Sequence, residues 1–277
     1  MTHHSIIAAL DEEIASASVS RRSALTRGAK LSAAAAAGLR LASVPVALSV
    51  FARDAFAQGG LPGVVVEVLN FALILEYLES EFYVTGVATA GLIPAQDRQI
   101  FTTIRDHEVA HVQYLQSTLG SRAARKPTFD YTAGNGSKAG PYADVFSNYA
   151  TFLAVAQAFE DTGVRAYKGQ APALKPYDAV LTAALTIHSV EARHASEVRR
   201  LRGNFSERAP NEGWITRNLT DIPGTAGTYA GEDNTVHGGV DATTITSVGL
   251  DEVTEAFDEP LTKAQVAAIV DPFVVSL

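Results

Sequence analysis

Residues 105–115 read RDHEVAHVQYL, and this stretch holds the pattern that decides the fold. Glu108 and His111 stand three positions apart, which places them on one face of a helix. The remaining positions of that face are apolar: Phe101, Ile104, Leu115 and Leu119. Such a face should pack in a core, where an unpaired carboxylate or imidazole is costly. The stretch is therefore either a partly exposed helix or one helix of a metal site.

A second copy of the pattern lies further along the chain, in HSVEARHASEV at residues 188–198. The offset in sequence number from Glu108 to Glu191 is the same as the offset from His111 to His194. One Glu-x-x-His pair recurs by chance in polar helices. Two pairs at a matched spacing favour a metal site.

Each pair is preceded by a helical stretch with its own glutamate, Glu76 in LILEYLESEFY and Glu160 in AQAFEDTGVRAY. A tyrosine stands seven positions after each of these glutamates: Tyr83 follows Glu76, and Tyr167 follows Glu160. The distance in sequence between the two tyrosines therefore equals the distance between the two glutamates, and it is one residue greater than the distance between the two Glu-x-x-His pairs. Four carboxylates in one apolar core would repel each other without a cation. The repeated pattern therefore predicts a site for two metal ions between two similar halves.

Periodicity and end signals predict four long helices, at residues 62–89, 94–119, 142–168 and 177–202. The links within each half are short. The link at 121–141, SRAARKPTFDYTAGNGSKAGP, is long enough to run the length of a bundle. The predicted fold is all-α: an antiparallel four-helix bundle of ferritin-like topology with one long crossover, followed by a mostly irregular C-terminal extension.

The segment at 1–57 resembles a twin-arginine export signal. Arg21 and Arg22 form the pair, Leu25 fits the pattern, and a run of mainly small and apolar residues at 31–51 precedes Ala55-Phe56-Ala57, which fits a cleavage site. A membrane anchor is the alternative, but the run is rich in alanine and is interrupted by an arginine and a proline. We therefore expect a periplasmic or secreted protein without a permanent membrane span after signal removal.

Composition narrows the function further. The net charge of −8 and the pI near 5.4 leave no surplus of basic residues to meet phosphates, so we expect no nucleic-acid partner. The chain has no cysteine, which excludes disulfides, thiolate metal sites and cysteine nucleophiles. Any metal must be held by nitrogen and oxygen ligands.

Residues 62–203 resemble the ferritin-like di-metal carboxylate superfamily, and within it the exported branch that includes plant desiccation-related proteins. The resemblance implies two iron or two manganese ions; sequence does not choose between them. It implies that one ion is held by Glu76, Glu108 and His111, and the other by Glu160, Glu191 and His194. Glu108 and Glu191 would bridge the two ions.

Several neighbouring residues are alternatives or candidate supports. Glu79 could replace Glu76 as ligand, but its counterpart in the second half is Gly163, so Glu76 is preferred. Tyr83 and Tyr167 are either core aromatics or catalytic groups that hydrogen-bond a ligand carboxylate or donate an electron. Four groups could orient a ligand imidazole but are not duplicated between the halves, so a surface or satisfied polar role is favoured: Asp106, His107, Gln157 and His188.

We divide the chain into a signal segment at 1–57, a bundle at 58–203 and an extension at 204–277. In the extension, TTITSV at 243–248 could be a short strand, and LTKAQVAAIVDPF predicts a helix with Thr262 as its N-cap. The extension either wraps the bundle or mediates oligomer contacts. Its acidic residues are assigned to a solvated surface: Glu232, Asp233, Asp251 and Glu255.

The resemblance implies an exported oxidoreductase in oxidative or desiccation stress protection. Its small substrates would be dioxygen, hydrogen peroxide or ferrous iron, in a ferroxidase, peroxidase or catalase type of reaction. Assembly into a homo-oligomer is left open. The alternative function is a non-catalytic metal-binding or structural stress protein.

Overall fold

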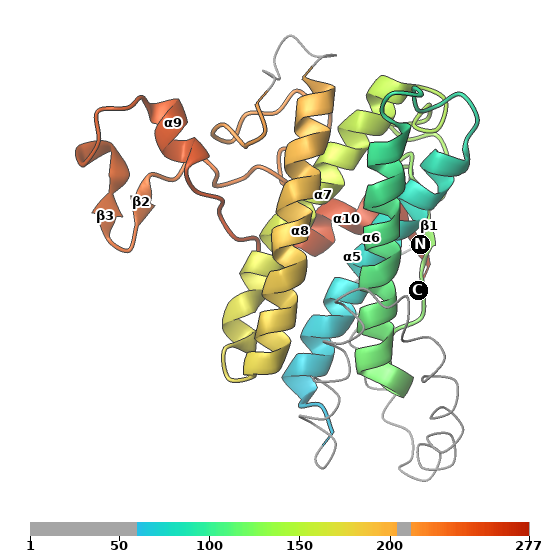
Figure 1. The fold of residues 1–277 in the computed structure, drawn as a ribbon, viewed down its shortest axis with the longest axis horizontal. Helices are drawn as coiled ribbons and strands as arrows, with labels where there is room; N and C mark the ends of the chain where they lie inside the picture. Colours follow the sequence, from blue (N-terminus) through green and yellow to red (C-terminus); the bar gives the residue numbers. More distant parts are fainter. Residues whose placement is uncertain (1–59, 204–211, 277) are drawn as a thin grey trace.

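The structure is a computed structural model that describes residues 60–203 and 212–276. Four long helices dominate it (Figure 1): α5 Gly63–Ala88, α6 Arg98–Leu119, α7 Tyr149–Leu174 and α8 Asp178–Arg202. Helices α5 and α8 run in one direction, and α6 and α7 run in the opposite direction. The predicted all-α, antiparallel four-helix bundle is confirmed. The predicted signal segment at 1–57 lies outside the described residues.

The helix ends follow local chemistry. Helix α6 stops before Gly120, whose φ of 60° favours glycine. Helix α7 begins later than the residue 142 that we expected, because the side chain of Asn148 accepts the backbone N–H groups of Ala150 and Thr151 and so caps it there. The same helix continues past residue 168 and tolerates Pro172 near its end.

The bundle core is built from two helix pairs, α5 with α6 and α7 with α8, which meet where α5 packs against α7. An aromatic cluster fills one part of that contact. Phe82 of α5 stacks on Phe152 of α7 with ring centroids 4.7 Å apart. Gly86 permits this approach, because a Cβ there would lie 2.4 Å from the Phe152 ring. The helices that carry the predicted ligands are therefore held at close range.

The long crossover links α6 to α7 and is tied to the end of the chain. It contains the turn η1 Gly120–Arg122 and the strand β1 Thr128–Phe129, which pairs antiparallel with β4 Val274–Ser276. Within the crossover the carboxylate of Asp130 accepts the backbone N–H groups of Thr132, Gly136 and Lys138. Among the described residues, no helix combines the length and apolar character that a bilayer crossing requires.

The C-terminal extension is mostly irregular, as predicted. Its short elements are β2 Val236–His237, β3 Val240–Asp241, η2 Ala242–Thr244, α9 Leu250–Glu255, α10 Lys263–Val270 and η3 Asp271–Phe273. The predicted helix is α10, with a capping box between Thr262 and Gln265. The stretch at 243–248, which could have been a short strand, does not form one, because the Asp241 side chain accepts the Thr243 N–H and closes a 3-10 turn.

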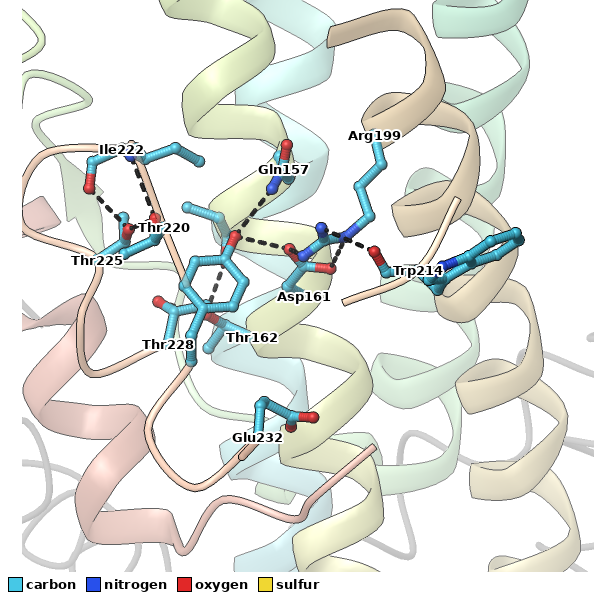
Figure 2. A network of polar contacts seen from close by, with 12 residues as sticks. Gln157, Asp161, Thr162, Arg199, Trp214, Thr220, Ile222, Thr225, Thr228 and Glu232 are labelled. Carbon is cyan, nitrogen blue, oxygen red and sulfur yellow. Dashed lines mark hydrogen bonds and ion pairs between the residues drawn. The ribbon is translucent and has the colours of Figure 1, made fainter. Parts of the chain in front are cut away.

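Part of the extension wraps α7 and α8 through buried polar contacts. Figure 2 shows Asp161 and Arg199 facing each other, and the Arg199 Nε lies 3.0 Å from Asp161 Oδ1. The hydroxyl of Tyr229, from the extension, donates to the same carboxylate at 2.7 Å. Arg165 pairs with Glu232 at 2.7 Å, and Glu232 is only 1% exposed. Our assignment of Glu232 to a solvated surface is therefore wrong, because Glu232 is buried and forms an ion pair with Arg165.

Candidate metal centre

The structure brings the six predicted ligand residues together in the middle of the bundle. One potential ligand atom from each of four side chains lies within 4.8 Å of the others in the first group, which is Glu76, Glu108, His111 and Glu191. The second group is defined in the same way and is Glu108, Glu160, Glu191 and His194. All six are at most 4% exposed. Glu108 and Glu191 belong to both groups, and they are the two residues that were predicted to bridge the ions.

Helix geometry explains how four segments reach one centre. Glu108 and His111 lie three positions apart on α6, and Glu191 and His194 do so on α8, so each pair projects from one face. Glu76 comes from α5, which packs against α6. Glu160 comes from α7, which packs against α8, and it completes the second group. The antiparallel bundle thus turns a repeated sequence pattern into one converging set.

Each imidazole faces carboxylates from three helices. His111 Nδ1 lies 3.0 Å from Glu191 Oε1, 3.2 Å from Glu76 Oε2 and 3.3 Å from Glu108 Oε2. These three contacts show that the first group surrounds a single ring nitrogen. A cation that replaced the proton on that nitrogen would meet oxygen atoms from α5, α6 and α8.

The second imidazole has a matching environment. His194 Nδ1 lies 2.8 Å from Glu108 Oε1, 3.4 Å from Glu160 Oε2 and 4.0 Å from Glu191 Oε2. The shortest of these contacts lacks hydrogen-bond geometry, so neither of its atoms is hydrogen-bonded in the described part of the chain. The two halves therefore present equivalent ring nitrogens to a shared set of carboxylates.

The buried oxygens fit a pair of cations. Several atoms of the centre have no hydrogen-bond partner among the described residues: Glu108 Oε1, Glu160 Oε2, both carboxylate oxygens of Glu191, and His194 Nδ1. An ionised carboxylate can only accept, and a buried acceptor without a partner is destabilising. A set of carboxylates and imidazoles suits manganese or iron. These residues therefore have the composition and the unmet bonding capacity of a metal centre, while their role as ligands stays a prediction.

Electrostatics within the metal-free cluster point the same way. Burial raises the pKa of Glu76 to about 7, against the opposing attraction of His111. Burial and the nearby Glu108 and Glu76 raise the pKa of Glu191 well above its usual value. Burial opposes ionisation of Glu108 as well, but its two imidazole neighbours outweigh burial and lower its pKa. The cluster thus retains protons that bound cations would displace.

The two duplicated tyrosines cross between the halves. The hydroxyl of Tyr83, on α5, donates to Glu160 Oε1 on α7 at 2.5 Å. The hydroxyl of Tyr167, on α7, donates in the same way to Glu76 Oε1 on α5. In each glutamate the other oxygen faces an imidazole of the centre. Each tyrosine therefore fixes one carboxylate oxygen and leaves the other to face the centre.

His107 supports the centre in a way that the sequence pattern did not favour. Its Nδ1 lies 2.9 Å from His194 Nε2, and the two rings stack with centroids 5.2 Å apart. Because His194 Nδ1 faces the carboxylates, this contact orients the ring from its outer side. His107 is itself exposed. Its counterpart in the second half is Val190, so the repeat that revealed the ligands carried no signal for it.

The other three candidate supports lie elsewhere. Asp106 is exposed and pairs with Arg105. Gln157 donates to Tyr229 and accepts from Arg202, within the contacts that hold the extension. His188 is half-buried, and among the described residues its Nδ1 has no hydrogen-bond partner. The surface or satisfied polar role that we favoured fits the first two, and none of the three touches the predicted ligands in the contacts described.

Comparison with known proteins adds one match. The family model described as ferritin-like domain matches residues 65–204, a range that includes all four bundle helices from Val65 onward and all six residues of the centre. No curated protein matches the chain.

Proposed function

The chain belongs to the ferritin-like domain family, and on that premise we propose that it is an oxidoreductase whose centre binds two iron or two manganese ions. The observation that carries the proposal is the pair of four-residue groups that share Glu108 and Glu191. Two groups with common carboxylates suit two neighbouring cations, because one carboxylate can offset charge on both. One isolated group would suit a single structural ion.

When bound, the ions would supply electrons or accept them in a reaction with dioxygen or hydrogen peroxide. The protein's own residues would hold them and control their surroundings. The six side chains are buried, and Tyr83 and Tyr167 keep one oxygen of Glu160 and of Glu76 in place by donating hydrogen bonds. Ferroxidase, peroxidase and catalase types of reaction are all compatible with this arrangement, with ferrous iron as substrate in the first.

Support for the physiological setting comes from the sequence alone. The Arg21-Arg22 pair and the apolar run after it resemble a twin-arginine signal, so we propose export to the periplasm or beyond. A peroxide-removing or iron-oxidising protein in that compartment would protect against oxidative or desiccation stress. Self-association into a homo-oligomer belongs to the same proposal.

Elemental analysis of the protein purified from its native compartment tests the proposal, followed by peroxide and ferrous-iron assays on the same material. The expected result is two iron or two manganese ions per chain and turnover of at least one substrate. Replacing Glu108 with alanine should remove both the metal and the turnover. Metal-loaded protein that is inert towards peroxide and ferrous iron would contradict the catalytic part of the proposal.

A non-catalytic metal-binding role is the second candidate, and one observation favours it. The six residues come from all four helices, so bound ions would cross-link the whole bundle. In that case the variants Glu108→Ala and His194→Ala lower the melting temperature of the metal-loaded protein, and no turnover exists for them to abolish. A catalytic rate that disappears in both variants would exclude this alternative.

A further inference from the structure

A cavity of about 710 Å³ lies between the bundle and the C-terminal extension. Its inner wall comes from α7 and α8, and its outer wall comes from α9 and the segment at 212–221. The volume falls within the range of about 300–1,000 Å³ that is usual for small-molecule sites. None of the six predicted metal ligands lines this cavity. The protein therefore has room for a small molecule outside the metal centre.

The inner wall of the cavity offers no unpaired positive charge. Arg199 Nε lies 3.0 Å from Asp161 Oδ1, and Arg199 Nη1 donates to the carbonyl of Trp214 at 3.2 Å (Figure 2). Arg202 Nη2 lies 2.7 Å from Asp221 Oδ1. An anionic ligand would have to compete with these carboxylates for both guanidinium groups. The inner wall therefore does not favour an anion.

The outer wall is acidic. Asp251 pairs with Arg217, which does not line the cavity, and Glu255 accepts a hydrogen bond from the Thr216 hydroxyl at 2.6 Å. In the described ranges, no hydrogen bond or ion pair engages the exposed carboxylate of Glu252. Four carboxylates line this side of the cavity: Glu212, Asp251, Glu252 and Glu255. Their negative charge exceeds what the neighbouring cations offset, so the outer wall favours a cationic ligand.

Two further features indicate the kind of cation. The carboxylates of the cavity do not converge on one point, because the described residues bring three or more potential ligand atoms together only in the metal centre. A single metal ion would need such convergence. The side chain of Trp214 also lines the cavity and is 50% exposed. An aromatic ring attracts an ammonium group and packs against hydrocarbon. Separated carboxylates beside an indole therefore suit an organic cation with more than one charged nitrogen.

We propose that this cavity binds a small aliphatic polyamine. The separate ammonium groups of the ligand pair with the carboxylates of the outer wall. The hydrocarbon between them packs on Trp214 and on Leu219, which is 63% exposed and also lines the cavity. Arg199 and Arg202 keep their carboxylate partners. Binding at this site does not depend on the proposed metal centre, so each can be tested without the other.

The fluorescence of Trp214 tests the proposal, because it is the one tryptophan of the chain and therefore reports on the cavity directly. Spermidine is added to the full-length protein at constant ionic strength. The fluorescence should change and saturate at one spermidine per chain, and calorimetry should give the same Kd. Choline carries one charge instead of three and should bind about tenfold more weakly, because each exposed ion pair changes affinity by up to about fivefold. Mg²⁺ at the same concentration of charge should not displace spermidine.

Substitutions locate the binding site within the cavity. Glu252→Gln should weaken spermidine binding by about twofold to fivefold, and Glu252→Gln combined with Glu255→Gln should weaken it by about tenfold. Trp214→Leu, followed by calorimetry, should weaken it by about twofold to fivefold. Asp233→Asn is the matched control, because Asp233 is an exposed acid of the extension that does not line the cavity. This control removes the same charge and should leave the Kd unchanged.

Each contrary result overturns the proposal. Wild-type protein whose fluorescence and heat do not respond to spermidine has no such site, and this titration decides the matter even if a variant fails to fold. Equal weakening in Asp233→Asn and Glu252→Gln, or displacement of spermidine by Mg²⁺, would show attraction to the net charge of −8 in place of a specific site. Choline that binds as tightly as spermidine would contradict the pairing of several nitrogens with separate carboxylates.

Discussion

Tyr83 and Tyr167 show how single hydroxyl groups can govern a metal site. Each donates to a glutamate of the opposite half, so one oxygen of Glu160 and one of Glu76 are held while the other faces an imidazole. Without the hydroxyl, the held oxygen would be buried without a partner and the carboxylate could rotate. Groups that orient a ligand in this way commonly change metal affinity by one to two orders of magnitude.

We therefore predict that Tyr83→Phe and Tyr167→Phe each weaken Mn²⁺ binding by about tenfold or more. Because the two bonds are related by the internal repeat, the two variants should behave alike. Titration calorimetry provides the measurement. Tyr131→Phe is the control, since that buried hydroxyl donates to the Leu78 carbonyl and should leave affinity unchanged. Wild-type affinity in both test variants would contradict the orienting role.

His107 makes a comparable contact from the outer side of the centre. It holds Nε2 of His194, and no such contact to Nε2 of His111 is found among the described residues. His107→Ala should therefore weaken the ion of the second group by about tenfold and affect the other ion less. Calorimetry with Mn²⁺ measures the affinity for both ions, and His188→Ala serves as the control. Equal weakening of the binding of both ions would show that His107 does not act through His194.

The site residues were predictable to different degrees. The six ligand candidates were found because they recur at a nearly constant offset between the two halves, and a repeat is visible in one sequence. His107 has a valine at the corresponding position of the other half, so its contact with His194 depends on how α6 and α8 pack. A rule based on symmetry finds shared parts and misses the parts that make the two halves differ.

At the scale of elements, the helices with clear end signals were predicted well. Helix α8 begins and ends within one residue of the expected range of 177–202, and α5 does so for 62–89. The predicted start of α7 was too early, because its cap, Asn148, lies inside a stretch that periodicity alone predicts to be helical. The strand pair β1–β4 could not be foreseen, because it joins the crossover to the end of the chain.

Close packing of the extension against α7 gives a test at this scale. A Cβ at Gly169 would lie 1.9 Å from the carbonyl oxygen of Leu261, whose N–H donates to the Arg165 carbonyl at 3.1 Å. Gly169→Ala should therefore force α7 and the extension apart and lower the free energy of unfolding by about 1–3 kcal/mol. Urea unfolding of the metal-free protein measures this change.

Gly63→Ala is the control for that experiment. No atom lies within 4 Å of a Cβ at Gly63, which begins α5, so alanine should be neutral or stabilising by up to about 1 kcal/mol. If Gly169→Ala is as stable as Gly63→Ala, the extension does not pack on α7 as described.

For the whole molecule, the centre couples stability to pH. Burial raises the pKa of Glu76 to about 7 in the folded, metal-free protein, from 4.5 when the group is unperturbed. Between these values the folded state holds a proton that the unfolded state has released. The contribution of Glu76 to stability is therefore full below pH 4.5 and is lost as the pH rises towards 7, by an amount on the order of 3 kcal/mol.

We predict that Glu76→Gln, which cannot ionise, removes this loss. In metal-free protein, the stability difference between Glu76→Gln and wild type should grow in favour of the variant from pH 5 to pH 7. Chemical unfolding in the presence of a chelator at several pH values measures it. Mn²⁺ affinity of the wild type should rise across the same window, because the proton must leave before the ion binds. A difference that is constant with pH would contradict the assignment.

The central claim is that two cations occupy the core of the bundle, and anomalous X-ray diffraction from crystals of the Mn²⁺-loaded protein tests it most directly. The account predicts two anomalous peaks per chain, one within each group of four side chains, with Glu108 and Glu191 in contact with both. A single peak, peaks confined to the surface, or glutamates of the centre turned away from the ions would contradict it.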